Sequence, residues 1–487
     1  MKISSKVGVA VLAAGLLVTG LGVWRGRPQP AGILAVSPIG GDRAIVVRGD
    51  SREGSPSAYF ELVDGSRTTD DTLSSRGVVW RRGVTGAAAH TDPWLRKSDA
   101  IAAGDTIVAR YLANPIGPGA ESTLPARVPF IGGFRATDGV QLWDRSPRDA
   151  KDPRGEAVAL ASLSLIAKGD RVVAFYGREL TADPWMSAIS IDPKTGADRW
   201  RAELRGTSTF GPAWIRGDSL FVHARPNLVV LELEGGKQRA SILMSDPPCM
   251  TADAAWHSRA GEIHQLSLTE LTSVLVTSTP AKDTRMTGAC AVRGGAVWVM
   301  GSNGDHATHR AWILGLDPRT GAERARIDLG AVRTGSADDE HTASATPHHV
   351  ALSGEATRFV PIIAVATGEE PRLLMIDLDQ KTIAWRSRPR AELTQASIRR
   401  VTTRYVLTSS ESPLVASWDG DTGRLTAATH APRGHAPFVS DDRVFVRDAS
   451  NVGALDPGTL VMAWSTGKIL IDDARSEAEA IFAPAVP

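Results

Sequence analysis

Hydrophobic residues fall into short runs along most of the chain, and polar turn residues separate these runs. Residues 171–175 and 219–222 are examples, because each apolar run follows a Gly-Asp pair and ends within a few residues. Short runs of this kind, bounded by turn signals, predict β-strands. No long stretch after residue 27 has the spacing of an amphipathic helix. The pattern therefore predicts an all-β body.

One polar motif marks the hairpins in this pattern. A strand ends in Asp, a Gly follows, and the next run closes on Trp, as at Asp192, Gly196 and Trp200. The Asp side chain caps its own turn and Gly takes the left-handed conformation, so a tight hairpin forms. A Trp on the return strand is large enough to fill the space between neighbouring sheets. The structural repeat residues predicted in this way are Asp138, Gly139, Trp143, Asp192, Gly196, Trp200, Asp317, Gly321, Asp377, Trp385, Asp419, Gly423, Asp456 and Trp464.

The spacing of the motif predicts the architecture. Most copies recur at intervals of about 40–60 residues, and earlier strand signals complete a unit of four strands. The interval from a weak copy at Glu232 to Asp317 is 85 residues, which leaves room for a hidden unit with strands at 263–268 and 271–276. Four-stranded units in a radial array predict a β-propeller of about eight blades, with seven to nine as the range.

The two ends of the propeller are treated separately. We assign residues 28–471 to the propeller and expect residues 33–37 or 469–471 to supply a strand that completes the last blade. Residues 472–487 are predicted to be a disordered tail or a short frayed helix. This arrangement would close the ring with one blade built from both ends of the chain.

The N-terminal segment, residues 1–27, has a different character. Residues 7–24 contain no charge, with Lys2 and Lys6 before them and Arg25 and Arg27 after them. An apolar run of this length just spans a bilayer core. It predicts an N-terminal hydrophobic helix acting as a signal anchor; a cleaved signal peptide and a buried core helix are the alternatives. We expect a cell-membrane protein with an extracytoplasmic propeller, or a secreted one if the segment is removed.

Composition narrows the classes of function. The 487 residues include 55 Lys and Arg against 54 Asp and Glu, a net charge of +1. This balance argues against nucleic-acid binding, which favours a strongly basic domain. Two cysteines exclude a disulfide-dense scaffold and a four-thiolate zinc site. Cys249 and Cys290 flank the hidden unit, where they form either a disulfide or two buried free thiols.

The repeat motif resembles that of a known family. Residues 190–200 and 315–324 are similar to the stretch A-x-D-x-x-T-G-x-x-x-W of the PQQ-like β-propeller repeat, and the resemblance covers about residues 40–467. It implies a propeller fold. The superfamily includes quinoprotein alcohol dehydrogenases and the propeller lipoprotein of the outer-membrane assembly machine.

Each of these two roles requires particular residues, and this sequence lacks them. The dehydrogenases use two adjacent cysteines, a Ca²⁺ site and a catalytic Asp, whereas Cys249 and Cys290 are 41 positions apart. The assembly lipoprotein carries a lipidated Cys soon after its signal, and none follows the apolar run here. We therefore expect no cofactor, and we assign the repeat Gly and Trp residues to the blades.

Other candidate chemistry is sparse. His306 and His309 beside Asp305, with an acidic run at 338–341 and two histidines at 348–349, suggest either a metal site or polar loops, and we favour loops. Asp419 and Asp421 resemble part of a calcium loop but fit a blade turn better. The nucleophile-elbow and phosphate-loop motifs are absent from the sequence.

The long inter-strand segments are the expected binding surface. They are residues 112–130, 245–261, 301–309 and 331–349, and loops on a rigid scaffold commonly carry function. We expect a non-enzymatic, membrane-tethered, monomeric platform that binds a protein or small ligand on this loop face. A quinone-dependent oxidoreductase with an atypical site and a sensor or polysaccharide-binding module are the alternatives.

Overall fold

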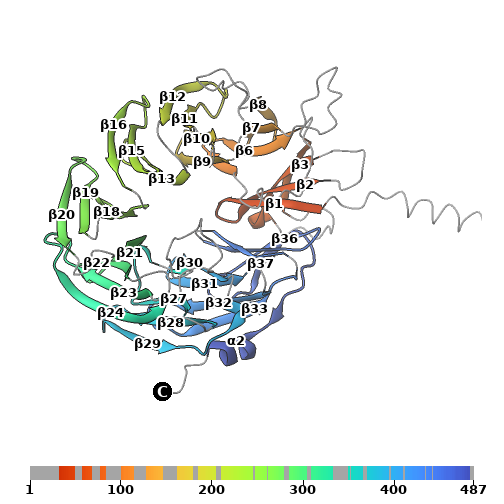
Figure 1. The fold of residues 1–487 in the computed structure, drawn as a ribbon. Helices are drawn as coiled ribbons and strands as arrows, with labels where there is room; N and C mark the ends of the chain where they lie inside the picture. Colours follow the sequence, from red (N-terminus) through yellow and green to blue (C-terminus); the bar gives the residue numbers. More distant parts are fainter. Residues whose placement is uncertain are drawn as a thin grey trace, which may run out of the picture.

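The computed structural model shows a closed ring of nine β-sheets (Figure 1). It describes residues 32–49, 58–67, 77–83, 100–113, 128–145, 162–178, 185–204, 210–244, 247–259, 262–278, 285–303, 309–332, 349–350, 352–365, 370–393, 396–409, 412–433, 435–440 and 442–482. The fold is an all-β propeller, as the sequence predicts, and its nine blades lie at the upper end of the expected range.

The first three blades are four-stranded meanders in chain order. Blade 1 contains β1 (Gly32–Gly40), β2 (Arg43–Gly49), β3 (Ala58–Asp64) and β4 (Val78–Gly83), with a 3-10 turn, η1 (Gly65–Arg67), after β3. Blade 2 contains β5 (Ala100–Ala103), β6 (Thr106–Ala113), β7 (Val128–Arg135) and β8 (Gln141–Arg145). Blade 3 contains β9 (Ser162–Lys168), β10 (Arg171–Arg178), β11 (Trp185–Ile191) and β12 (Asp198–Leu204).

The middle three blades repeat this plan, and blade 6 gains a fifth strand that runs parallel to β21. Blade 4 contains β13 (Phe210–Arg216), β14 (Ser219–Ala224), β15 (Asn227–Glu232) and β16 (Gln238–Leu243). Blade 5 contains β17 (Cys249–Met250), β18 (Ala254–Arg259), β19 (Glu262–Ser267) and β20 (Ser273–Ser278). Blade 6 contains β21 (Arg285–Arg293), β22 (Ala296–Asn303), β23 (His309–Leu316), β24 (Glu323–Val332) and the added β26 (Ser353–Glu355).

The last three blades complete the ring. Blade 7 contains β25 (His349–Val350), β27 (Phe359–Val365), β28 (Pro371–Asp377) and β29 (Thr382–Arg386), followed by η4 (Ala391–Leu393). Blade 8 contains β30 (Ala396–Val401), β31 (Arg404–Ser409), β32 (Leu414–Asp419), β33 (Leu425–His430) and an added β38 (Asp472–Asp473). Blade 9 contains β34 (Phe438–Val439), β35 (Val444–Arg447), β36 (Val452–Leu455) and β37 (Met462–Ser465).

The hidden unit of the sequence is blade 5. Its hairpin between β19 and β20 has the geometry of the Asp-Gly turns but uses other residues. Ser267 takes the place of Asp, and its hydroxyl accepts a hydrogen bond from the backbone N–H of Glu270 at 3.1 Å. Leu271 takes the place of Gly, with φ of 57°. The turn is therefore maintained although neither signature residue is present.

Tryptophans of the outer strands connect successive blades. Trp143 in β8 donates a hydrogen bond to the carbonyl of Pro193 in blade 3 at 2.8 Å, and its ring covers Gly196 so closely that a Cβ there would overlap it. The same contact between a ring and the next blade's turn joins Trp80 to Gly139, Trp200 to Gly236 and Trp464 to Gly65. Gly423 departs from this arrangement, because it faces Phe359. Trp385 is half-buried against the core of blades 6 to 8.

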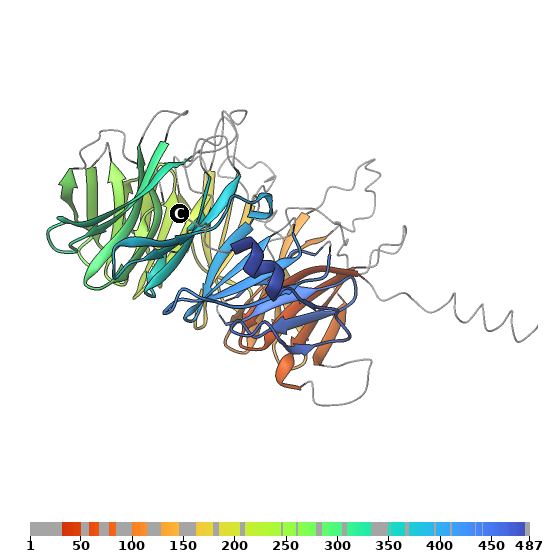
Figure 2. The ribbon, with the colours of Figure 1, turned by 90° about the horizontal axis from the view of Figure 1, so that it is seen from below.

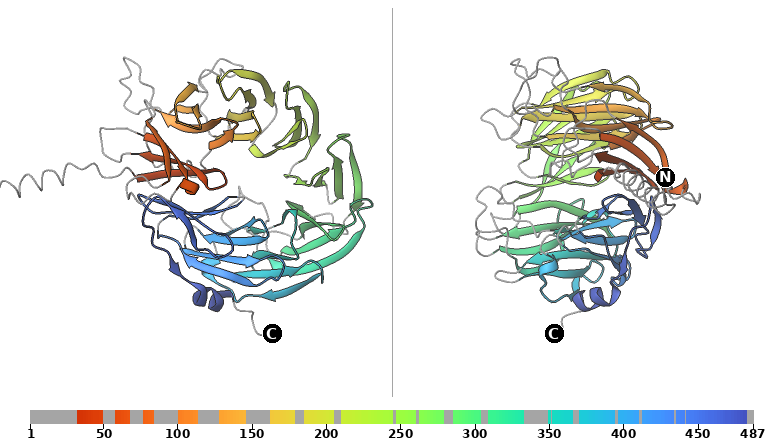
Figure 3. Two further views of the ribbon diagram at one scale, coloured as in Figure 1. Left: turned by 180° about the vertical axis from the view of Figure 1, so that it is seen from behind. Right: turned by 90° about the vertical axis from the view of Figure 1, so that its right-hand side faces the viewer.

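The ring closes without a shared blade, so the prediction of a closing strand from residues 33–37 or 469–471 is wrong. β1 belongs to blade 1, and blade 9 is built from one continuous segment. The two blades adjoin in Figures 1 and 3, and the N–H of Ile33 donates to the carbonyl of Ala449 at 3.1 Å. Apolar residues of both blades, including Val46 and Phe445, form one buried cluster between them.

The C-terminal segment contains a short helix, one of the two alternatives expected for residues 472–487, and this helix is packed against the ring through residue 482 where a frayed one was expected. β38 pairs with β33, and helix α2 (Arg475–Phe482) follows it on the outside of the ring (Figure 2). Ala478 and Phe482 are buried, and the Phe482 ring meets Trp418 edge-on with centroids 4.9 Å apart. An isolated helix of eight residues is unstable, so tertiary packing holds α2.

The predicted N-terminal helix, with its apolar residues 7–24, lies outside the described residues. Within the part of the chain that the structure describes, no helix is long and apolar enough to cross a membrane.

Candidate functional site

The Asp residues of the repeat serve as turn formers on separate blades. Asp317 Oδ1 accepts hydrogen bonds from the backbone N–H groups of Arg319 at 2.8 Å and Thr320 at 2.9 Å. Asp192, Asp377, Asp419 and Asp456 bind the two N–H groups of their own turns in the same way. Asp138 differs, because it accepts from Val140. These carboxylates are committed to local hairpins and do not converge on one site.

The turn geometry affects the acidity of these carboxyls. The backbone N–H groups of Thr320 and Arg319, with a further contribution from Arg324, lower the pKa of Asp317 from 3.8 to about 2. Hydrogen bonds to the charged form favour ionisation. The shift therefore reflects a structural hairpin and gives no indication of a catalytic acid.

The segments expected to form the binding face are only partly visible. Residues 114–127, 304–308 and 333–348 lie outside the described residues, and with them His306 and the acidic run at 338–341. His309 begins β23. The segment 245–261 is not a long loop, since it contains β17 and β18 of blade 5. Among the described residues, no group of three or more His, Cys, Asp or Glu side chains could hold a metal ion.

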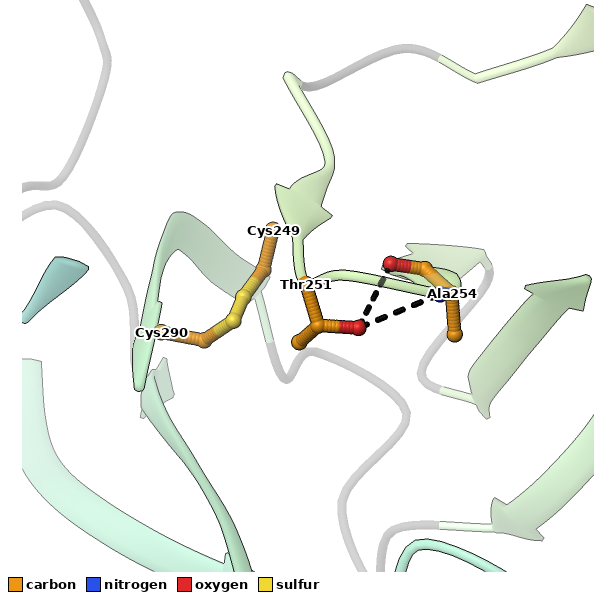
Figure 4. The surroundings of a disulfide bond; sticks show 4 residues. All are labelled: Cys249, Thr251, Ala254 and Cys290. Atoms are coloured by element: carbon orange, nitrogen blue, oxygen red, sulfur yellow. Dashed lines mark hydrogen bonds between the residues drawn. A yellow bond between two sulfur atoms is a disulfide. The ribbon is translucent and has the colours of Figure 1, made fainter. Parts of the chain in front are cut away.

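Blade 5 has an unusual inner side. Cys249 in β17 and Cys290 in β21 form a disulfide that joins blades 5 and 6, with Cα atoms 5.3 Å apart (Figure 4). Both cysteines are buried. The Thr251 hydroxyl donates to the carbonyl of Ala254 at 2.9 Å and accepts from its N–H at 3.1 Å, which fixes the turn between β17 and β18. The short inner strand β17 is therefore held in place from two directions.

The outer side of the same blade is exposed and apolar. The outer strand of a blade is the fourth in chain order, and for blade 5 this is β20 at the rim of the ring (Figure 1). Val274 and Leu275 in β20 are 53% and 52% exposed. The strand Ser-Val-Leu-Val-Thr-Ser carries no charge. We call the outer side of β20 the blade 5 edge.

The other described outer strands differ from β20 in features that disfavour edge-to-edge pairing. Arginines are present in β4, β8, β12, β16, β24 and β29. β33 is covered by β38, and β37 is only four residues long. Charge, cover and short length are the usual protections of sheet edges. Among the described outer strands, β20 alone combines six residues, no charge and no covering strand.

The chain itself demonstrates that a blade edge can accept another strand. β38 pairs antiparallel with β33, with Thr429 opposite Asp473 and His430 opposite Asp472. The Thr429 hydroxyl donates to the carbonyl of Asp472 at 2.7 Å. The blade 5 edge offers exposed apolar side chains and an outer backbone row, which a β-bulge at Val276 interrupts, since Ile263 pairs with Thr277 and His264 with Leu275. Val274 and Leu275 were not among the residues predicted to bind a partner, because that prediction was confined to the loops.

Comparison with known proteins gives one family match for this chain. The family model described as outer membrane protein assembly factor BamB matches residues 185–395 and 369–483. No sequence among the curated proteins matches the chain.

Solved structures of several propellers are similar to it. BamB from Moraxella catarrhalis is 15% identical, with 72% of this chain and 93% of that chain covered and a TM-score of 0.42. Apo AztD from Citrobacter koseri is 12% identical over 79% and 94%, with a TM-score of 0.40. Quinohemoprotein alcohol dehydrogenase from Comamonas testosteroni is 10% identical over 93% and 79%, with a TM-score of 0.43. Since the family model covers more than half of the chain, the chain belongs to the PQQ-like β-propeller family described as outer membrane protein assembly factor BamB.

Proposed function

We propose that the chain is a non-enzymatic, extracytoplasmic propeller, tethered to a membrane through residues 7–24, that serves as a scaffold for binding another protein. The observation that carries this proposal is the blade 5 edge: an exposed, uncharged strand on a ring whose other rim strands are protected. Membership of a family described as an assembly factor supports the same role.

The disulfide supports the location. Disulfides such as Cys249–Cys290 persist in oxidising compartments and are rare where the cytosol keeps thiols reduced. The apolar run of residues 7–24 supplies the means of export and attachment. The proposal therefore joins an N-terminal anchor to an external propeller.

Site-specific photocrosslinking in the native cells tests protein binding. A photoreactive residue at Val274 of the full chain is expected to give discrete crosslinked products, identified by mass spectrometry. The matched control is Val461, which is 63% exposed on a hairpin of blade 9. Products that form equally at both positions, or at neither, would contradict the proposed use of the blade 5 edge.

A second experiment tests the non-enzymatic part of the proposal. Pyrroloquinoline quinone is titrated into the full chain in detergent, with and without Ca²⁺, while the fluorescence of the 13 tryptophans is followed. We expect no saturable quenching, because the chain lacks the adjacent cysteines of the quinone dehydrogenases. Saturable, Ca²⁺-dependent quenching would overturn this part of the proposal and lead to assays with alcohols and sugars.

A further inference from the structure

The connections between strands divide the ring into two faces. The turns between the first and second strands of a blade, and between the third and fourth, lie on one face, which we call the turn face. The connections between second and third strands, and the links from blade to blade, lie on the opposite face, which we call the loop face. At the junction of blades 9 and 1, Arg443 binds Asp42 at 2.7 Å on the turn face. The N–H of Ile33 donates to the carbonyl of Ala449 at 3.1 Å on the loop face, so the two faces are continuous across this junction.

The chain enters the ring on the loop face. β1 begins there at Gly32, and Arg447 of blade 9 donates to the carbonyl of Ile33 at 2.9 Å. The uncharged run of residues 7–24 ends at Trp24, eight residues before Gly32. Eight residues of extended chain span at most about 29 Å. β1 has nine residues and is itself about 30 Å long, so that whole length would be used in reaching the level of the turn face.

This limit determines which face a membrane anchor can hold against a bilayer. We infer that the loop face, at the junction of blades 8, 9 and 1, rests on the headgroup layer of the bilayer that contains residues 7–24. The inference rests on the proposed function, because it requires the membrane tether. It leaves the blade 5 edge at the rim of the ring available for a protein partner.

A leucine on this part of the loop face supports the contact. Leu470 is 70% exposed, which is the highest value among the large hydrophobic side chains that the structure describes. It lies between β37 and β38, and β38 pairs with the loop-face end of β33, where Asp472 is opposite His430. Ile469 is buried in the cluster between blades 8 and 9. Leu470 can therefore bury its side chain only against something outside the ring, and apolar side chains gain by burial in the interfacial region of a bilayer.

The charges around Leu470 are balanced. Lys468 and Arg433 are exposed on this face, and neither forms an ion pair with another described residue. Basic side chains of this length can reach lipid phosphates. Of the nearby carboxylates, Asp448 accepts two backbone N–H groups of its own turn at 2.7 Å, and Asp472 and Asp473 lie at the rim beside β33. We therefore expect the contact to depend on the tether and on Leu470 more than on anionic lipid.

Two exposed positions on opposite faces of the ring give a matched test. Val461, 63% exposed, lies in the hairpin between β36 and β37 on the turn face, whereas Leu470 lies beyond the other end of β37. Full-length Leu470→Cys and Val461→Cys are labelled with a fluorophore and reconstituted in phosphatidylcholine vesicles that contain a lipid with a nitroxide on its headgroup. The native cysteines do not react, because they are bonded to each other. We expect the label at position 470 to be quenched several-fold more strongly than the label at position 461.

An aqueous quencher provides the control for local environment. In detergent, iodide is expected to quench both labels about equally, since both positions are exposed. In vesicles, iodide should quench the label at position 470 less than in detergent and the label at position 461 to the same extent as before. Protection of both labels in vesicles, or of neither, would contradict contact through the loop face.

Flotation separates this inference from the proposed function. A chain that does not float with the vesicles overturns both the tether and the inference. A chain that floats, but whose label at position 461 is quenched by the headgroup nitroxide as strongly as the label at position 470 or more so, overturns the inference and leaves the tether standing. Photocrosslinking at Val274 tests protein binding at the blade 5 edge in either case.

Discussion

Some glycines at the blade junctions are required for two reasons at once: their backbone is left-handed, and a neighbouring tryptophan ring leaves no room for a Cβ atom. Gly196 has φ of +73°, and a Cβ added there would overlap the Trp143 ring of the preceding blade. Gly169 has a similar φ of +61° but nothing within 4 Å of its Cβ position. The pair therefore separates backbone strain from steric overlap with the tryptophan ring.

We expect Gly196→Ala to lower the free energy of unfolding by about 2–4 kcal/mol, since a left-handed alanine and an overpacked ring both destabilise the fold. Gly169→Ala is expected to cost only about 1–2 kcal/mol, from strain alone. Chemical denaturation of both variants measures the difference. Equal losses would show that the ring moves away without cost and that the Trp–Gly contact does not stabilise the junction.

Asp317 links a hairpin to acid stability. Its pKa is about 2 in the fold against 3.8 ordinarily, so the folded state favours the charged carboxylate. This contribution is complete above about pH 4 and is lost as the pH falls toward about 2, when the folded carboxyl also takes up its proton. We expect Asp317→Asn to be destabilising at about pH 5 and nearly neutral at about pH 1.5, below the folded pKa of about 2. Urea midpoints at the two pH values measure this, and a penalty independent of pH would contradict it.

At the scale of elements, the sequence predicted the strands correctly where the hairpin between them carries the Asp and Gly signature residues. Asp192 with Gly196 announces its hairpin, but Ser267 and Leu271 form the same turn without either signal. Ser267 succeeds because its hydroxyl also accepts a backbone N–H. A search for the Asp-Gly motif does not detect this turn, which is recognised only from the pairing of β19 with β20 in the structure.

The remaining errors concern elements that depend on distant partners. α2 is too short to form alone, and it is stabilised because Ala478, Ile481 and Phe482 are buried in the cluster that contains Trp418 of blade 8. The blade 5 edge was missed for a related reason: Val274 and Leu275 are ordinary residues for a strand. Their importance comes from the position of β20 at the rim, which the local pattern does not contain.

The disulfide is expected to stabilise the junction of blades 5 and 6. Cys249 and Cys290 enclose a loop with a sequence separation of 41, for which the chain-entropy model gives about 4 kcal/mol. We expect the double variant Cys249→Ala/Cys290→Ala to unfold at lower denaturant, beginning with blade 5. Hydrogen exchange in β18 and β19 reports this local opening. Unchanged exchange there would show that apolar packing around Trp256 holds the junction without the bond.

At the scale of the whole molecule, closure of the ring depends on the junction between blade 1 and blade 9, which we call the seam. No strand is shared across it. Buried Glu61 in β3 accepts a hydrogen bond from Arg48 at 2.5 Å and another from Arg81 at 2.5 Å. Arg48 also donates to the carbonyl of Ser450 in blade 9 at 2.7 Å. Near the seam, Arg443 of blade 9 binds Asp42 of blade 1 at 2.7 Å. A sequence search for a closing strand could not find this closure, because it consists mainly of side-chain contacts, with one backbone hydrogen bond from Ile33 to Ala449.

Glu61 is therefore the residue on which closure is expected to depend most. Glu61→Gln removes the charge that two arginines share and leaves buried Arg48 without its ionic partner, which costs about 3 kcal/mol or more. We expect amide exchange in β1 and β36 to rise about 100-fold while the far side of the ring, in blades 4 to 6, changes little. The control is Asp328→Asn, which breaks an exposed pair with Arg310 and should change exchange hardly at all. Faster exchange all around the ring would contradict this prediction and would mean that the nine blades unfold as one unit. Exchange equal to wild type in β1 and β36 would mean that the apolar cluster containing Val46 and Phe445 closes the seam without the ion pairs.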